Sequence, residues 1–78
     1  MIKYVISRGF TGLPQTDENR HFVKMAYDKI IGHCYLMDVA DYAMACHYET
    51  LNDALKSIEY YGIKNAKIFK VVSTLKPV

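Results

Sequence analysis

The sequence predicts an α+β fold in which two helices cover one face of a four-stranded antiparallel sheet. Two observations lead to this prediction. Two segments carry apolar side chains at helical spacing between helix-start and helix-stop residues, and short strand-like segments flank and separate them. The chain has 78 residues, of which 51% are hydrophobic. That length and composition fit one domain with a packed core, residues 1–78.

The first strand is expected at residues 2–8, where apolar side chains occupy both faces, as in a central strand that is covered on both sides. A loop follows over residues 9–16, because Gly9, Gly12 and Pro14 interrupt any regular pattern. The two glycines have the spacing of phosphate-clamping GxxG loops. Such a loop needs a helix on either side, however, and here a strand precedes it.

Residues 17–31 allow two interpretations. In the helical one, Thr16 caps the first turn, Gly32 ends the last one, and apolar residues recur every fourth position: Phe22, Ala26 and Ile30. In the strand interpretation, apolar residues occupy every second position: Val23, Met25 and Tyr27. Because the signals at both ends agree with a helix, we predict a helix here and keep the strand as the alternative.

The second half of the chain contains two strand-like segments, a helix and a final strand. Strands are expected at residues 34–37 and 44–49, joined by a turn that can form a hairpin connection or a short helical turn. Residues 50–61 form the second helix, with a buried stripe made of Leu51, Ala54, Leu55 and Ile58. The last strand is expected at residues 66–73.

The ends of the second helix carry clear signals. Thr50 can cap its first turn, with Asp53 at the third helical position, and Gly62 ends it. The element order is then βαββαβ, the ferredoxin-like plan. In this plan the helices share one face of the sheet, so the other face is left to solvent or to a partner.

Residues 42–49 and 51–58 resemble the third strand and second helix of an RNA-recognition-motif domain, in which an Asp-Ala pair, here Asp53-Ala54, precedes an apolar helix face. Tyr4-Val5-Ile6 is similar to the first-strand motif of that family. The resemblance implies the ferredoxin-like fold and, in the family, stacking of RNA bases on exposed aromatic residues of the first and third strands.

The third-strand positions of that motif depart from the family pattern. They hold Ala43 and Ala45 in one alignment, or Tyr42 and Met44 when it slides by one residue, and the Lys/Arg-Gly opening is missing. We therefore expect the fold of the family without its RNA binding. The same strand-to-helix pattern also resembles very small phage-encoded proteins.

Charge and hydropathy limit the class of partner. The formal net charge is +2, with basic residues 60–78 following an acidic segment at residues 36–59. A nucleic-acid-binding domain usually has a larger basic excess. The longest apolar run is too short for a bilayer span, and the first residues form a strand pattern in place of a signal peptide. We therefore predict a cytoplasmic protein, in the host cytoplasm if it is phage-encoded.

Cysteine and histidine form two dipeptides, His33-Cys34 and Cys46-His47. If their strands pair, the two cysteines meet on one face and the two histidines on the other, because adjacent strand residues point in opposite directions. No four-ligand zinc cage forms in that arrangement, and a disulfide would need oxidising conditions. We predict reduced thiols, no metal, no cofactor and no catalytic residue.

The aromatic residues indicate a binding function. The chain has seven Tyr and no Trp. Not all of the phenols can be buried, since each buried hydroxyl needs a partner, and Tyr is enriched at protein interfaces. We predict a small non-catalytic binding protein that uses the open sheet face, on which His33, Tyr35 and His47 lie. The last strand supplies three further candidate binding residues, Lys67 and Phe69 on one of its faces and Lys70 on the other.

The predicted partner is a protein. It could be a second copy of the chain, forming a homodimer, or a host protein that a phage-type inhibitor would block. The alternative is single-stranded RNA or DNA bound on the same face, with Tyr35 stacking on a base and Lys67 or Lys70 contacting phosphate. The loop at residues 9–16 is the alternative location of the site.

Overall fold

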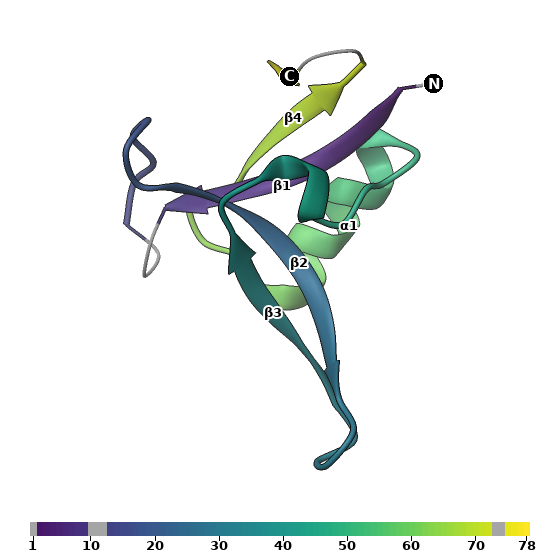
Figure 1. Cartoon of the computed structure of the whole chain (residues 1–78). Coiled ribbons are helices and arrows are strands. Elements are labelled where there is room, and N and C mark those ends of the chain that lie inside the picture. The colour runs from purple at the N-terminus through teal and green to yellow at the C-terminus, as the bar shows by residue number, and fades with distance from the viewer. Residues whose placement is uncertain (1, 10–12, 73–74) are drawn as a thin grey trace.

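The computed structural model of the chain describes residues 2–9, 13–72 and 75–78 (Figure 1). Over these residues it shows one antiparallel five-stranded sheet, one α-helix and one short 3-10 turn. The elements, in chain order, are β1 (Lys3–Gly9), β2 (Arg20–Asp28), β3 (His33–Val39), η2 (Tyr42–Met44), α1 (Leu51–Tyr61), β4 (Lys67–Val71) and β5 (Leu75–Pro77). The strand order is β3-β2-β1-β4-β5, so β3 and β5 are the two edges.

The prediction of a ferredoxin-like fold with four strands and two helices is wrong, because residues 17–31 contain β2 in place of a helix. The residues that suggested helix ends belong to turns. The Thr16 hydroxyl accepts a hydrogen bond from the Asn19 N–H at 3.2 Å, and Gly32 lies in the β2–β3 turn. The informative signal was the alternating pattern, whose members share one face of β2: Val23, Met25 and Tyr27.

The segment after β3 also differs from the strand expected at residues 44–49. Asp41 accepts a hydrogen bond from the Ala43 N–H at 3.0 Å and starts η2, which is the helical-turn alternative. Within the described part of the chain, residues 44–49 make one strand-type bridge, between Tyr48 and Tyr4. The expected pairing of the two Cys-His dipeptides is therefore wrong, since β3 pairs with β2.

Residues 45–48 fill a fork between β1 and β2, which pair at one end and then diverge. The Cys46 N–H donates to the Val23 carbonyl of β2 at 3.1 Å. Tyr48 and Tyr4 exchange two backbone hydrogen bonds of 2.8 Å each. These bonds satisfy the backbone as the chain passes from the face of the sheet that carries η2 to the face that carries α1.

A buried cluster lies on each face of the sheet. The first joins Val5, Phe22 and Phe69 to Ala45, and Tyr42 of η2 meets the Phe22 ring edge-on, with ring centroids 6.1 Å apart. The second lies on the opposite face, next to α1, and consists of Ile6, Val23, Ala54 and Ile63. The prediction of one open sheet face is therefore wrong over β1, β2 and β4, where η2 covers the first cluster.

The helix α1 begins and ends where the sequence predicts. Thr50 accepts a hydrogen bond from the Asp53 N–H at 3.0 Å, and Gly62 takes the left-handed conformation that ends the helix. The buried stripe is narrower than expected. Ala54 is fully buried, whereas Leu55, which the sequence placed in the stripe, is 50% exposed.

Candidate functional site

The end of the β2–β3 hairpin projects beyond the rest of the sheet (Figure 1). β1 pairs with residues 20–22 of β2, whereas β3 pairs with residues 22–28. Residues 24–37 therefore extend past β1 as a two-stranded ribbon, which we call the arm.

Asp28 and Gly32 determine the turn at the tip of the arm. The Asp28 carboxylate accepts hydrogen bonds from the N–H groups of Ile30 and Ile31, at 2.9 and 3.4 Å. The Asp28 carbonyl accepts a third bond, of 2.8 Å, from Gly32. Gly32 has a φ of 70°, a conformation that costs other residues about 1–2 kcal/mol. Backbone and carboxylate groups thus close the turn without help from the isoleucine side chains.

Those isoleucine side chains lie in solvent. Ile30 is 95% exposed and Ile31 is 62% exposed. Turns are normally built from Gly, Pro, Asn, Asp and Ser, so two exposed isoleucines at a tip are unusual. Neither belongs to a buried cluster, so their hydrophobicity contributes little to holding the fold together.

More apolar surface continues along the strands of the arm. Tyr35 and Met37 are exposed on the face of the sheet that carries η2, and Tyr27 is exposed on the opposite face. Single exposed apolar residues are common, but a group of them on one projecting element is typical of an interaction surface.

The base of the arm is fixed to the body by α1. Tyr61 donates a hydrogen bond from its hydroxyl to the Met25 sulfur at 3.2 Å, and Leu36 packs against the second cluster. The pKa of Tyr61 is raised, first by burial and then by neighbours that include the Cys34 thiol. This shift in pKa favours the neutral hydroxyl, which is the donor in the bond to Met25.

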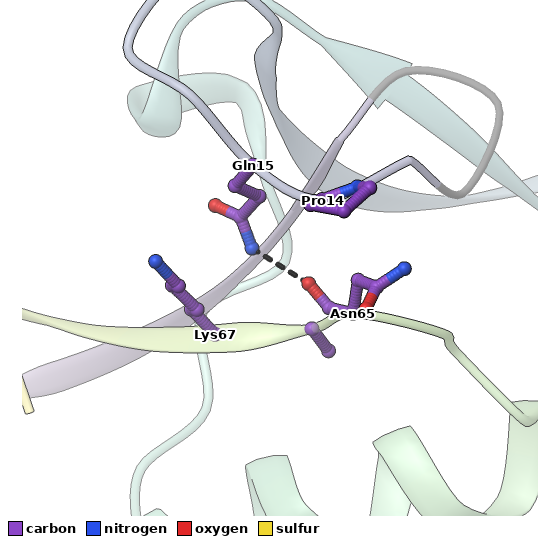
Figure 2. A pocket seen from close by; sticks show the side chains of 5 residues that line it. Pro14, Gln15, Asn65 and Lys67 are labelled. Carbon is purple, nitrogen blue, oxygen red and sulfur yellow. Dashed lines mark hydrogen bonds between the residues drawn. The ribbon is translucent and has the colours of Figure 1, made fainter.

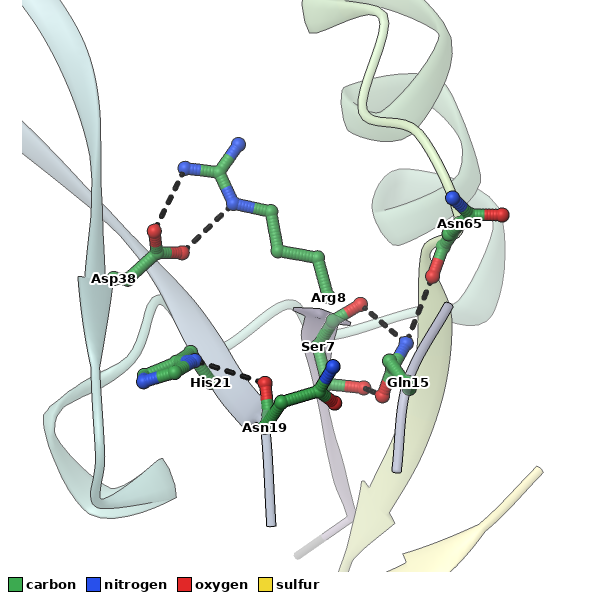
Figure 3. A network of polar contacts seen from close by, with 7 residues as sticks. All are labelled: Ser7, Arg8, Gln15, Asn19, His21, Asp38 and Asn65. Carbon is green, nitrogen blue, oxygen red and sulfur yellow. Dashed lines mark hydrogen bonds and ion pairs between the residues drawn. The ribbon is translucent and has the colours of Figure 1, made fainter. Parts of the chain in front are cut away.

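An ion pair provides a second attachment, across the sheet from β1 to β3 (Figure 3). The Arg8 guanidinium donates to both carboxylate oxygens of Asp38, at 2.7 and 3.3 Å. Both side chains are about three-quarters buried. The arm is thus attached at its base, while its tip and outer strand face solvent.

The six predicted binding residues are spread over the molecule. His33 and Tyr35 lie together on one face of the arm. Phe69 is buried in the first cluster, and Lys67 and Lys70 lie on opposite faces of β4. His47 is in the segment that fills the fork.

Figure 2 shows a small open pocket beside the loop before β2, lined by Pro14, Gln15, Asn65, Ala66 and Lys67. The Gln15 side-chain amide crosses it to donate to the Asn65 carbonyl at 2.9 Å. The same side chain bonds the buried hydroxyl of Ser7, at 2.7 Å (Figure 3). These contacts give Gln15 a structural role. The alternative site at residues 9–16 includes 10–12, which lie outside the described residues.

The role of Ile30 and Ile31 was not predicted from the sequence. Ile30 was expected on a helix stripe, because it falls four residues after Ala26. The signal that could have located the tip is the pair Asp28 and Gly32, which follows the alternating apolar residues 23–27. Asp favours turns because its carboxylate binds nearby backbone N–H groups, and Gly favours them because it adopts positive φ.

Comparison of the chain with protein-family models, with curated proteins and with solved structures finds no match. Among the residues that the structure describes, no three His, Cys, Asp or Glu side chains gather as a metal site would require. None of the described helices has the length and apolar character needed to cross a membrane. The candidate site therefore rests on the geometry of the arm.

Proposed function

We propose that this chain is a non-catalytic binding protein that engages a protein partner through the arm. The observation that carries the proposal is the exposure of the Ile30 and Ile31 side chains at a turn whose closing bonds involve only their backbone N–H groups. Large side chains that project from a well-defined turn are suited to filling a pocket on a partner, where their burial stabilises the complex.

The chemistry of the arm favours a protein over a single-stranded nucleic acid. A nucleic-acid groove combines aromatic residues with lysines that follow the phosphate backbone. The predicted phosphate contacts Lys67 and Lys70 are on β4, and β2 and β1 separate them from Tyr35 on β3. The arm itself contributes only two lysines, Lys24 and Lys29. Exposed isoleucines contribute neither stacking nor charge, whereas an apolar pocket in a protein accommodates them.

Site-specific photocrosslinking in the cells that express the chain tests this proposal. A photoreactive phenylalanine analogue replaces Ile31 in one variant and Tyr60 in the control. Tyr60 is a suitable control because it is 82% exposed and lies on α1, outside the arm. We expect a discrete protein adduct from position 31 and none of comparable yield from position 60.

Competition shows whether that adduct depends on the apolar tip. Excess native chain is expected to suppress it, whereas the Ile30→Ser/Ile31→Ser chain should compete at least about tenfold more weakly, because each buried isoleucine contributes about 1.5–3 kcal/mol. Equal competition by the two chains, equal adducts at both positions, or an adduct to nucleic acid would contradict the proposal.

A further inference from the structure

The two edges of the sheet differ in their protection against strand addition. The edge at β5 has three residues and includes Lys76 and Pro77. Short length, lysine and proline are the features by which sheet edges avoid pairing with other chains. The edge at β3 is seven residues long and contains neither lysine nor proline.

The backbone of β3 is also available for pairing. Within the described residues, the backbone hydrogen bonds of His33–Val39 are those of its ladder with β2. The one carboxylate of the strand, Asp38, is held by Arg8 at 2.7 Å and does not shield the edge. Alternate N–H and C=O groups of β3 therefore face away from β2 without a protein partner.

From this difference we infer that β3 pairs antiparallel with β3 of a second copy of the chain, about a two-fold axis at Leu36. The inference rests on the proposed function, because it names the partner that the outer strand of the arm binds. An antiparallel pair of identical strands satisfies the two-fold symmetry of most homodimers.

A register centred on Leu36 is the one that pairs all seven residues of both strands. It places Tyr35 opposite Met37 of the second copy, an aromatic–apolar pair of the kind that stabilises sheets. It also sets Asp38 opposite an uncharged residue, Cys34. A register centred on Asp38 would bring two carboxylates face to face, which is unfavourable.

The exposed apolar side chains of β3 support a second copy as the occupant. Tyr35 is 47% exposed and Met37 is 38% exposed. In the register centred on Leu36 each Tyr35 packs beside a Met37 of the other copy, and the two-fold axis repeats this contact, so the pairing covers apolar surface on both copies, as an isologous interface requires.

Sedimentation equilibrium with paired charge substitutions tests the inference. The native chain is expected to show a concentration-dependent monomer–dimer equilibrium. Tyr35→Lys/Met37→Lys sets lysine opposite lysine twice across the axis, so it should weaken dimerisation at least about tenfold. The matched variant Tyr35→Lys/Met37→Glu keeps the lysine at position 35 but sets it opposite glutamate in the other copy. It should therefore dimerise more tightly than the double-lysine variant. Both positions are exposed, so the fold should tolerate each change.

Disulfide trapping tests the register. In a Cys34→Ser background, Leu36→Cys puts two thiols directly opposite each other on the axis. Their Cα atoms would be about 4.5–5.5 Å apart, within disulfide range. Mild oxidation should therefore give a covalent dimer. The two native Cys34 residues would be about 13 Å apart along the strands, so the native chain is expected to give none.

A native chain that remains monomeric at about 1 mM, a concentration at which even a very weak dimer would be detected, would overturn the inference. So would equal dimerisation constants for the two charge variants, or efficient oxidation through Cys34 in place of the introduced thiol. If the chain is monomeric and position 31 still crosslinks to a different protein, the second-copy inference fails and the proposed function stands.

Discussion

Phe22→Ala is expected to lower the free energy of unfolding by about 3–5 kcal/mol. Phe22 is buried at the centre of the first cluster, where its ring meets Tyr42 and Phe69 edge-on, each with centroids 6.1 Å away. Truncation leaves a cavity between the sheet and η2. Because a domain of this size has a total stability of about 4–12 kcal/mol, much of the population would unfold.

Urea denaturation followed by circular dichroism measures this loss. Tyr60→Ala is the matched control, since it removes an aromatic ring from an exposed site, and it should cost less than about 1 kcal/mol. Equal midpoints for the two variants would mean that the first cluster is not a core.

Ala54→Asp should cost about 3–5 kcal/mol, the expected penalty for an uncompensated buried charge. Ala54 is fully buried, in the same cluster as Ile6 and Val23. The same substitution at the next residue, Leu55→Asp, should cost less than about 1 kcal/mol, because Leu55 is half-exposed.

Thermal and chemical denaturation of the two aspartate variants rank them directly. The reverse order, with Leu55→Asp the more damaging, would mean that α1 is rotated by about 100° relative to the sheet. The stripe expected from the sequence would then face the core.

Local signals in the sequence predicted several elements. The helix at residues 50–61 was found because Thr50 and Gly62 terminate it through their own hydrogen bonds and backbone conformation. The strands near residues 2–8, 34–37 and 66–73 were also found, since each combines apolar residues over a short length. The last of these predictions includes residue 73, which lies outside the described residues.

The fold class was missed at residues 17–31, where two periodicities coexist. The spacing of Phe22, Ala26 and Ile30 matches a helix, but long-range pairing of β2 with β1 and β3 decides the outcome. The segment that covers Phe69 was also not predicted. Its position depends on residues 45–48 passing between β1 and β2 from one face of the sheet to the other. No local pattern encodes that crossing.

The candidate site was predictable in part. His33 and Tyr35 were assigned to a binding surface from residue type, and both are exposed on the arm. The tip was missed, because recognising it required the correct strand assignment first. An inhibitory role and a cytoplasmic location stay predictions of the sequence.

The central claim is that the arm tip is kept for binding and is not part of the folding core. The most direct test is the free energy of unfolding of Ile30→Ser/Ile31→Ser, measured by urea denaturation in the Tyr35→Lys/Met37→Lys background so that self-association does not contribute. The account predicts a change within about 0.5 kcal/mol, as for other exposed sites. A loss of about 2 kcal/mol or more, the magnitude of buried isoleucines, would contradict it.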